Sequence, residues 1–368
     1  MNITYASTGV NYDAMDPFKR MAQQAAQETA NNICRFNTGW ASELALSRGE
    51  SAYLIETSHS FLAHVEEGLG TKNLVADAMY DGHGKSYYDQ IAQCTVAMIV
   101  NDLITLGALP LSVAMHLAVG NSDWFNDKKR TGDLINGWRN ACNLARCTWG
   151  GGETPTLKGV VIPEAVVLSG SAIGIIEPKK RLIISRLIQH GDAIVIIESS
   201  GIHANGLTLA RKIADKLPEG YLTKLSDGRT YGETLLDSTH IYVGLVEDCL
   251  DAGVNIHYAV NITGHGWRKL MRATQPFTYV IETLPTQLPI FDFLQQHGPV
   301  DDMEAYGNLN MGAGFALYVD EAQANQVIDI AKKFGLRAFV AGHIEDGEKK
   351  VVIKTKNLVF GGETLAVR

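Results

Sequence analysis

Three short segments of this 368-residue chain place a carboxylate beside glycine or a side-chain amide. These segments are Glu66-Glu67-Gly68-Leu69-Gly70-Thr71-Lys72, Asn101-Asp102 and Gly150-Gly151-Gly152-Glu153-Thr154. No histidine or cysteine occurs within them, and carboxylate oxygens without such companions suit Mg²⁺ better than zinc. The pattern therefore favours a magnesium site, with solvated surface carboxylates as the alternative interpretation.

Two residues in these segments carry a further indication. Lys72 follows Glu67 by five residues in a Gly-x-Gly-Thr-Lys turn, where an ammonium group can meet a phosphate as a point charge. Asp102 lies in a segment that is apolar on most sides, and a charge in such a place needs a partner. Carboxylates together with a lysine of this kind predict a magnesium nucleotide as ligand.

Two junctions in the second half of the chain combine glycine with hydrogen-bond donors, at residues 199–206 and 261–266. Backbone amides at a helix N-terminus, with nearby hydroxyl and amide side chains, form a cradle for an anion. We interpret both as phosphate loops, and an ordinary N-cap with a turn is the alternative. His203 and His265 lie among these turn residues and are predicted to face a ligand. His257 lies in an apolar strand, which fits a core histidine as well as a catalytic one.

Composition and missing motifs disfavour several classes of function. The sequence contains no GxxxxGK[ST], GxGxxG, HExxH or GxSxG pattern, which argues against Walker, Rossmann, zincin and hydrolase sites. A net charge of -8 without a basic run argues against nucleic acid as a partner. The apolar stretches are shorter than the roughly 20 residues of a bilayer span, and the first residues do not resemble a leader, so we expect a cytoplasmic protein. The five cysteines include no CxxC pair and are predicted to be reduced thiols.

Helices and strands that alternate along the chain must position these residues. Asp16 followed by Pro17 predicts a helix start, and apolar periodicity predicts further helices. The predicted helices cover 17–34, 87–107, 128–146, 206–216, 233–251, 267–273, 290–297 and 321–334. The predicted strands cover 52–56, 111–119, 165–176, 193–198, 256–260, 277–282, 314–319, 336–344 and 351–354. The alternation indicates an α/β or α+β fold in which helices cover a sheet.

The length of the chain predicts two domains, because one hydrophobic core rarely grows beyond about 250–300 residues. A charged, proline-initiated segment follows Glu177 and interrupts the glycine-rich pattern of the first half. We therefore expect one domain over residues 1–177 and a second over residues 178–368.

Eight motifs, in one order, resemble the phosphoribosylformylglycinamidine cyclo-ligase family, also called aminoimidazole ribonucleotide synthetase. In the first half, YASTGVNYDA is similar to YxxAGVD, EEGLGTK to TDGVGTK, AMIVNDLITLGALPLS to AMxVNDLxxxGAxPL and GGGETP to GGETA. In the second half, ESSGIHANGLTLARKI is similar to SSGxHSNGxSLxRKI, STHIYV to PTRIYV, IHYAVNITGHGWRKLMR to HxxAHxTGGGxxENxxR and MEAYGNLNMGAGFALYV to EMxRTFNxGxGM.

The resemblance implies an N-terminal ATP-binding α/β domain that pairs with a second copy to form a homodimer, and a C-terminal α/β sandwich. It implies ATP- and Mg²⁺-dependent ring closure of formylglycinamidine ribonucleotide to aminoimidazole ribonucleotide in purine biosynthesis. By this resemblance the metal ligands are Glu67, Asp102 and Glu153. The catalytic residues are Lys72, Asp102 and His257. The nucleotide contacts are Gly68, Gly70, Thr71, Lys72 and Asn101, and the ribonucleotide contacts are Ser199, Ser200, His203, Asn205, Thr263 and Gly264.

Departures from the family motifs leave other functions open. Glu66 and Glu67 stand where the motif has Thr and Asp, and Cys94 stands where an aspartate is expected. On the substrate side Asn261 replaces His, His265 replaces Gly, and Gly307 and Asn308 replace Arg and Thr. One alternative is a diverged relative that uses ATP and magnesium on another small substrate. The other is a non-catalytic nucleotide-binding dimer.

Overall fold

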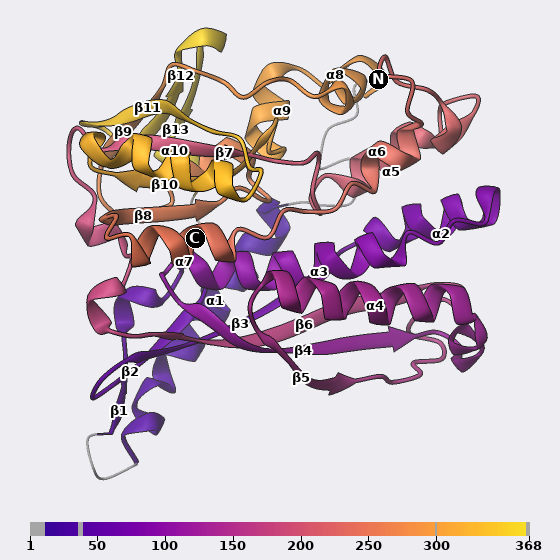
Figure 1. The fold of residues 1–368 in the computed structure, drawn as a ribbon, viewed down its shortest axis with the longest axis horizontal. Coiled ribbons are helices and arrows are strands. Elements are labelled where there is room, and N and C mark those ends of the chain that lie inside the picture. Colours follow the sequence, from indigo (N-terminus) through magenta and orange to yellow (C-terminus); the bar gives the residue numbers. More distant parts are fainter. Residues whose placement is uncertain (1–11, 36–39, 299, 366–368) are drawn as a thin grey trace.

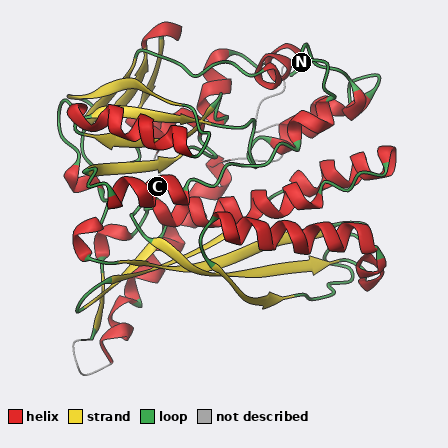
Figure 2. Ribbon diagram, viewed as in Figure 1, coloured by secondary structure: helices red, strands yellow, loops and turns green. Residues whose placement is uncertain are grey.

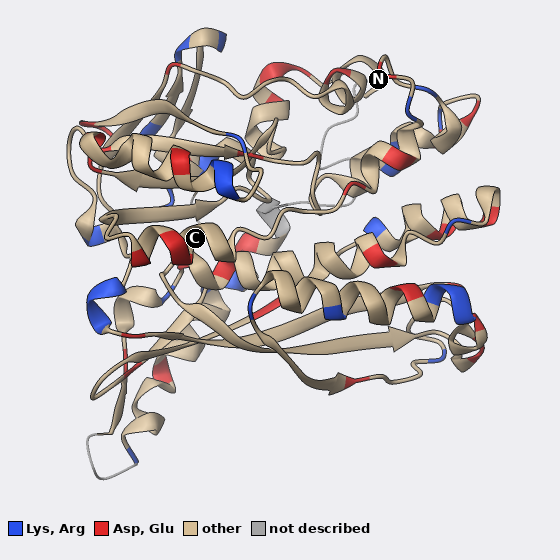
Figure 3. Ribbon diagram, viewed as in Figure 1, with Lys and Arg blue, Asp and Glu red and all other residues tan. Residues whose placement is uncertain are grey.

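The computed structural model describes residues 12–35, 40–298 and 300–365, and its strands form two separate sheets. Figures 1 and 2 show the sheets as two layers, with helices packed between them. Figure 3 shows acidic and basic residues interspersed over both layers. No helix of the described ranges combines the length and the apolar character that a membrane crossing needs.

The N-terminal half contains a six-stranded sheet. Its strands are β1 (Ala41–Glu43), β2 (Tyr53–Thr57), β3 (Phe61–Gly68), β4 (Leu109–Val119), β5 (Thr148–Glu153) and β6 (Val166–Ile176), in the order β1-β2-β3-β6-β4-β5. Its helices are α1 (Tyr12–Glu28), α2 (Lys72–His83), α3 (Tyr88–Ile104) and α4 (Lys128–Leu144). Neighbouring strands are antiparallel except for β4 and β5.

Helix α3 lies between this sheet and the C-terminal half (Figure 1). Every residue of α3 from Cys94 to Ile104 is buried. A helix that is apolar on most sides is buried on most sides, and α3 packs on β3, β4 and β6 as well as on α7 (Val243–Asp251) and β8 (Ile256–Asn261). This central position lets its polar residues reach both halves.

The C-terminal half contains a seven-stranded sheet in the order β13-β12-β9-β11-β7-β10-β8. Besides β8, its strands are β7 (Ala193–Glu198), β9 (Phe277–Ile281), β10 (Ala313–Val319), β11 (Ala338–Asp346), β12 (Lys350–Ile353) and β13 (Leu358–Gly361). Besides α7, its helices are α5 (Leu207–Ala214), α6 (Tyr231–Leu235), α8 (Pro289–His297), α9 (Asp302–Asn308) and α10 (Ala324–Lys333). Strands β7 and β10 and the edge strand β8 are almost entirely buried, which matches their largely apolar sequences.

The predicted mixed fold is confirmed, and most predicted strands and helices appear within a few residues of their expected limits. The first helix differs, because α1 already begins at Tyr12 and includes Pro17. Pro17 is the sixth residue of this 17-residue helix, where it removes the hydrogen bond that its main-chain nitrogen would otherwise donate to the carbonyl group of residue 13. Instead of the α-helix predicted over residues 267–273, the structure has a 3₁₀ turn at Gly266–Met271.

The helix predicted over residues 233–251 is wrong, because the segment divides into α6 and α7 with a loop at residues 236–242 between them. Main-chain groups of this loop bond to side chains of the N-terminal half, which competes with helix formation. Strands β1, β3, β5 and β13 and helices α2 and α9 lie outside the predicted ranges, although β3 and α2 flank the Gly-Leu-Gly-Thr turn.

Candidate active site

Glu67 and Asp102 come together in a pocket of about 250 Å³. Glu67 continues the inward-facing row of Phe61, Ala63 and Val65 on β3, because alternate residues of a strand share a face. Glu66 therefore points to the opposite, exposed side. Of the two adjacent glutamates, Glu67 is the one that faces α3 and Asp102.

Burial, and then the negative charge of Asp102, raise the pKa of Glu67 to about 7. Two carboxylates in one poorly solvated pocket repel each other, and a cation between them would relieve the repulsion. The described residues thus form a site that favours a proton or a metal ion at Glu67.

The raised pKa predicts a pH-dependent stability cost. In the ligand-free protein, ionised Glu67 should oppose folding as the pH rises from about 4.5 towards 7. We expect Glu67→Gln to increase the free energy of unfolding at pH 8 by about 1–3 kcal/mol, and to have little effect at pH 4.5. Urea titrations of both proteins at the two pH values measure this, and an equal effect at both would contradict it.

The C-terminal half provides the opposite side of this pocket. Asn261, the last residue of β8, donates from Nδ2 to Asp102 Oδ1 at 2.7 Å. The Lys269 amine donates to the hydroxyl of Thr263, and burial lowers the pKa of Lys269 to about 8 despite the opposing charges of Asp102 and Glu67. The predicted loop at residues 261–266 therefore does meet the predicted carboxylates.

Charged residues complete the lining of the pocket. They come from α1 (Lys19), from the loop before β2 (Glu50) and from the 3₁₀ turn and its end (Lys269, Arg272), with Ser51, His265 and Leu365 beside them. His265 has a left-handed φ of 67° although it is not glycine. Burial and nearby cations lower the pKa of His265 to about 3, so this imidazole is neutral at physiological pH.

Glu153 does not join Glu67 and Asp102 in this subunit. Glu153 lies on β5 and pairs with His116 on β4. His116 in turn pairs with Ser169 on β6, and Ser169 pairs with Gly68 on β3. Three strand spacings of about 4.8 Å place β5 roughly 14 Å from β3. The side chain of Glu153 also points to the outer face of this sheet, whereas the side chain of Glu67 points to the inner face. The prediction of Glu153 as a third ligand thus finds no support within one copy of the chain.

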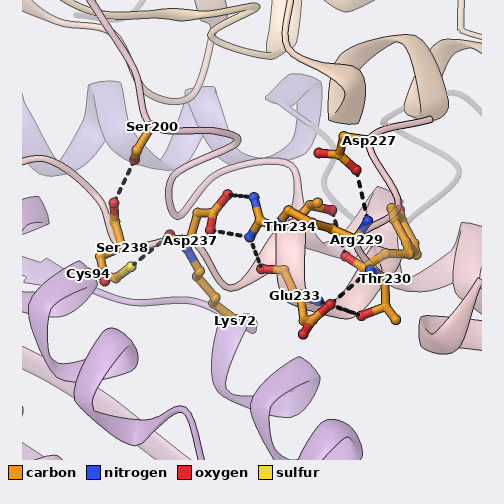
Figure 4. Close-up of polar contacts among 11 residues, drawn as sticks. Lys72, Cys94, Ser200, Asp227, Arg229, Thr230, Glu233, Thr234, Asp237 and Ser238 are labelled. Atoms are coloured by element: carbon orange, nitrogen blue, oxygen red, sulfur yellow. Dashed lines mark hydrogen bonds and ion pairs between the residues drawn. The ribbon is translucent and has the colours of Figure 1, made fainter. Parts of the chain in front are cut away.

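Lys72, the first residue of α2, is fully buried between the two halves. Its Nζ donates to the main-chain oxygens of His203, at 2.8 Å, and Asp237, at 2.7 Å. Figure 4 shows the side chain pointing at the loop that carries Asp237, whose carboxylate is held by Arg229. The turn of Gly68, Gly70 and Thr71 and the loop at residues 199–206 are thereby brought close to each other.

The loop at residues 236–242, which carries Asp237, is also bonded to side chains along α3. Gln93 Nε2 donates to Thr239 O at 3.0 Å, and the Thr239 amide donates to Cys94 Sγ at 3.3 Å. Asn101 donates to His240 O at 2.8 Å and accepts from the Tyr242 amide at 3.0 Å. The side chain of Asn101, predicted as a nucleotide contact, is thus engaged with the C-terminal half.

The predicted ribonucleotide loop at residues 199–206 is mostly bonded to itself and its neighbours. Ser199 Oγ donates to Gly201 O at 2.9 Å, and Ser200 Oγ donates to Ser238 O at 2.6 Å. Asn205 is the exception, because its buried Nδ2 has no hydrogen-bond partner among the described residues. Gly206, with φ 82°, then leads into α5 without a side-chain cap. An unpaired amide beside uncapped helix N–H groups suits an anionic ligand.

His257 lies away from this pocket, near the opposite end of β8 from Asn261, and four residue-to-residue steps along the strand separate the two by about 13 Å. Its Nδ1 contacts the Asp192 carboxylate at 2.8 Å, and the hydrogen bond to Asp192 raises the pKa of His257. The structure does not bring this predicted catalytic residue to the carboxylates, and a paired histidine of this kind is typical of a structural role.

Sequence reasoning missed the basic side of the pocket. Lys269 and Arg272 are three residues apart on one turn and both face the carboxylates, but only the fold places them opposite Glu67. The Gly-Trp-Arg-Lys-Leu-Met-Arg segment has cationic residues at helical spacing, and this spacing could have indicated that Lys269 and Arg272 share one side of a turn.

Comparisons with known proteins agree on one family. Residues 49–176 match the model of the AIR synthase related protein N-terminal domain, and residues 189–355 match that of the C-terminal domain. A phosphoribosylformylglycinamidine cyclo-ligase of Carboxydothermus hydrogenoformans is 34% identical over 356 residues, which cover 95% of this chain and 98% of the relative. One from Methanocaldococcus jannaschii is 35% identical over 294 residues, covering 79% and 80%.

Solved structures show the same fold at low identity. The HypE–HypF complex gives a TM-score of 0.59 at 16% identity, covering 84% of this chain and 92% of the other. ThiL complexed with AMPPCP and TMP gives a TM-score of 0.57 at 14% identity, covering 84% and 89%. Phosphoribosylformylglycinamidine synthase II of Thermotoga maritima gives 0.56 at 15%, covering 86% of this chain and 46% of the other.

Proposed function

The chain belongs to the phosphoribosylformylglycinamidine cyclo-ligase family, and from this premise we propose that it closes the ring of formylglycinamidine ribonucleotide with ATP. In this reaction the formyl oxygen is phosphorylated, and an amidine nitrogen then displaces phosphate to give aminoimidazole ribonucleotide. Such a reaction needs positioning and charge neutralisation more than a strong nucleophile. The observation that carries the proposal is the Glu67–Asp102 pair, which faces the donors of the opposite half across one pocket.

The carboxylate pair fits Mg²⁺. Glu67 and Asp102 supply the oxygen ligands that this ion prefers, and the raised pKa of Glu67 reflects a repulsion that a cation would remove. Bound there, Mg²⁺ would neutralise charge on the phosphoryl group in transfer. Asn261 holds Asp102 in place from the C-terminal half, and Lys269 adds a second positive charge.

Lys72 has a positioning role in this proposal. Its ammonium group joins the loops of His203 and Asp237, which sets the turn of Gly70 and Thr71 against the loop of Asn205. Direct contact between Lys72 and a phosphate stays a prediction; the two carbonyl groups use two of the three N–H donors of the ammonium group, and the third would have to make this contact.

A second candidate is a related ATP-dependent reaction on another small substrate. The pocket favours it in one respect, because the neutral side chain of His265 and the amine of Lys269 occupy the substrate side. The family motif has Gly at the first of these positions. Purified protein, ATP, Mg²⁺ and formylglycinamidine ribonucleotide test the choice directly: equal amounts of phosphate and aminoimidazole product support the cyclo-ligase, whereas ATP binding without turnover supports the other substrate.

Asn205 is proposed to contact the ribonucleotide. Since its amide is buried without a partner, Asn205→Ala should remove a ligand contact at little cost in stability. We expect KM for the ribonucleotide to rise about tenfold, with a change of less than about twofold in KM for ATP. Steady-state kinetics with each substrate varied in turn will show this, and the reverse order would mean that the two binding sites are exchanged.

The proposed assembly is a cytoplasmic homodimer formed through the outer face of the N-terminal sheet. This face exposes apolar residues on two neighbouring strands, namely Leu111 on β4 and Val167 and Ile173 on β6. Exposed apolar side chains gathered on one sheet face mark an interaction site.

A charge on that face should prevent the proposed dimer. We expect Ile173→Lys to sediment as a monomer at concentrations where the wild type sediments as a dimer, because an ammonium group would be buried unpaired at the interface. Ile135→Lys is a matched control, since Ile135 is equally exposed, at 53% against 52%, but lies on α4. A dimeric Ile173→Lys protein would place the interface elsewhere.

A further inference from the structure

The C-terminal end of α4 forms a turn that brings two cysteines together. Arg146 has a left-handed φ of 54°, and its amide donates to Asn143 O at 3.1 Å. The Cys147 amide donates to Cys142 O at 3.0 Å. These two bonds define a Schellman motif, in which the side chains of the first and last bonded residues pack on each other. In this chain both of those side chains end in a thiol.

The two thiols have different surroundings. Cys142 is 3% exposed and belongs to the core, whereas Cys147 is partly exposed and packs against that core. A hydrogen bond from the Cys142 thiol lowers the pKa of Cys147 and raises that of Cys142. Cys147 is therefore the more reactive thiol, because the thiolate is the nucleophile and it is the one that a reagent can reach.

The backbone turn already brings Cys142 and Cys147 close together. Disulfides join residues whose Cα atoms are about 4.4–6.8 Å apart, and the hydrogen bond from Cys147 N to Cys142 O brings the backbones of the two cysteines together. Arg146 fixes the turn further, since its guanidinium donates to Glu247 at 2.6 Å and Asp248 at 3.1 Å on α7. The turn thus places the two cysteines where rotation of their side chains can bring the sulfur atoms together.

We propose that Cys142 and Cys147 form a reversible disulfide by exchange with a low-molecular-weight disulfide such as oxidised glutathione. The Cys147 thiolate attacks one sulfur of the reagent, forms a mixed disulfide and expels one thiolate. Cys142 then loses its proton and attacks the Cys147 sulfur, which expels the second thiolate. Two protein thiols lose two protons and two electrons, and the reagent gains both electrons as two thiols.

Mass spectrometry of the full-length protein after exposure to oxidised glutathione and trapping of free thiols tests this site. We expect wild-type protein to lose two trappable thiols at Cys142 and Cys147 without retaining glutathione there, and to regain them with dithiothreitol. Cys142→Ser should instead keep a stable glutathione adduct on Cys147, because the resolving thiol is gone. Cys147→Ser should leave Cys142 reduced.

Cys249→Ser is the matched control, because Cys249 is buried and burial raises its pKa without a second thiol nearby. This variant should form the Cys142–Cys147 bond as the wild type does. A stable glutathione adduct on wild-type Cys147, or two thiols that stay trappable throughout, would overturn the proposal. Neither outcome depends on the ATP-dependent reaction.

Discussion

Asp102→Asn is expected to reduce ATP turnover at least about 1,000-fold while the protein remains folded. The substitution removes one negative charge from the Glu67–Asp102 pair, which we propose as the Mg²⁺ site. It keeps a side-chain oxygen that can accept the 2.7 Å hydrogen bond from Asn261. Phosphate release measured over a range of Mg²⁺ concentrations, with circular dichroism to confirm folding, gives the result.

Glu66→Gln is the matched control for this variant. Glu66 is adjacent to Glu67 but points to the exposed face of β3, so its charge does not enter the pocket. Turnover within about twofold of the wild type is expected. Near-normal activity of Asp102→Asn would disprove the assignment of the metal site, whereas loss of activity in both variants would indicate a general electrostatic effect.

Lys72→Met should cause the largest loss of stability, about 2–4 kcal/mol in the free energy of unfolding. Methionine has a similar length but cannot donate, so the main-chain oxygens of His203 and Asp237 would lose a charged partner in a buried place. Hydrogen bonds to charged groups contribute about 1.5–3 kcal/mol each, and unpaired buried acceptors carry their own cost. Urea unfolding monitored by fluorescence measures the loss.

Lys128→Met is a suitable control, because Lys128 is an exposed residue of the first turn of α4. Its stability should change by less than about 0.5 kcal/mol. If Lys72→Met lost less than about 1 kcal/mol but raised KM for ATP strongly, Lys72 would act on the nucleotide and not on the joint between the halves.

Local patterns predicted much of the fold because the strands and helices bury continuous faces. The buried strand β7 was predicted with its observed limits from its apolar run, and α3 from its helical period. Residues 236–242 could not be predicted in this way, since their conformation depends on Lys72, Gln93 and Asn101 more than 130 residues away. Such long-range contacts leave no periodic signal in the sequence.

The site was predicted in part for a similar reason. Glu67 and Thr263 were recognised by residue type and neighbouring glycine, and Asp102 by its neighbour Asn101 and its apolar segment, and the fold brings all three to one region. Lys269 was not recognised, because a lysine on a turn is usually solvated and only tertiary structure buries it near two carboxylates. The wider residue roles, including those of Gly264 and His257, stay predictions.

The loop at residues 236–242 is bonded to helices α2 and α3 through its main chain. Lys72, Gln93, Cys94 and Asn101 bond to carbonyl and amide groups of the loop, and none of these contacts depends on a loop side chain. Substitutions within residues 238–241 should therefore be tolerated during evolution. Substitutions of the α3 residues Gln93, Cys94 and Asn101 should be removed by selection. Related chains can thus vary the side chains of this loop without losing the main-chain hydrogen bonds that connect their two halves.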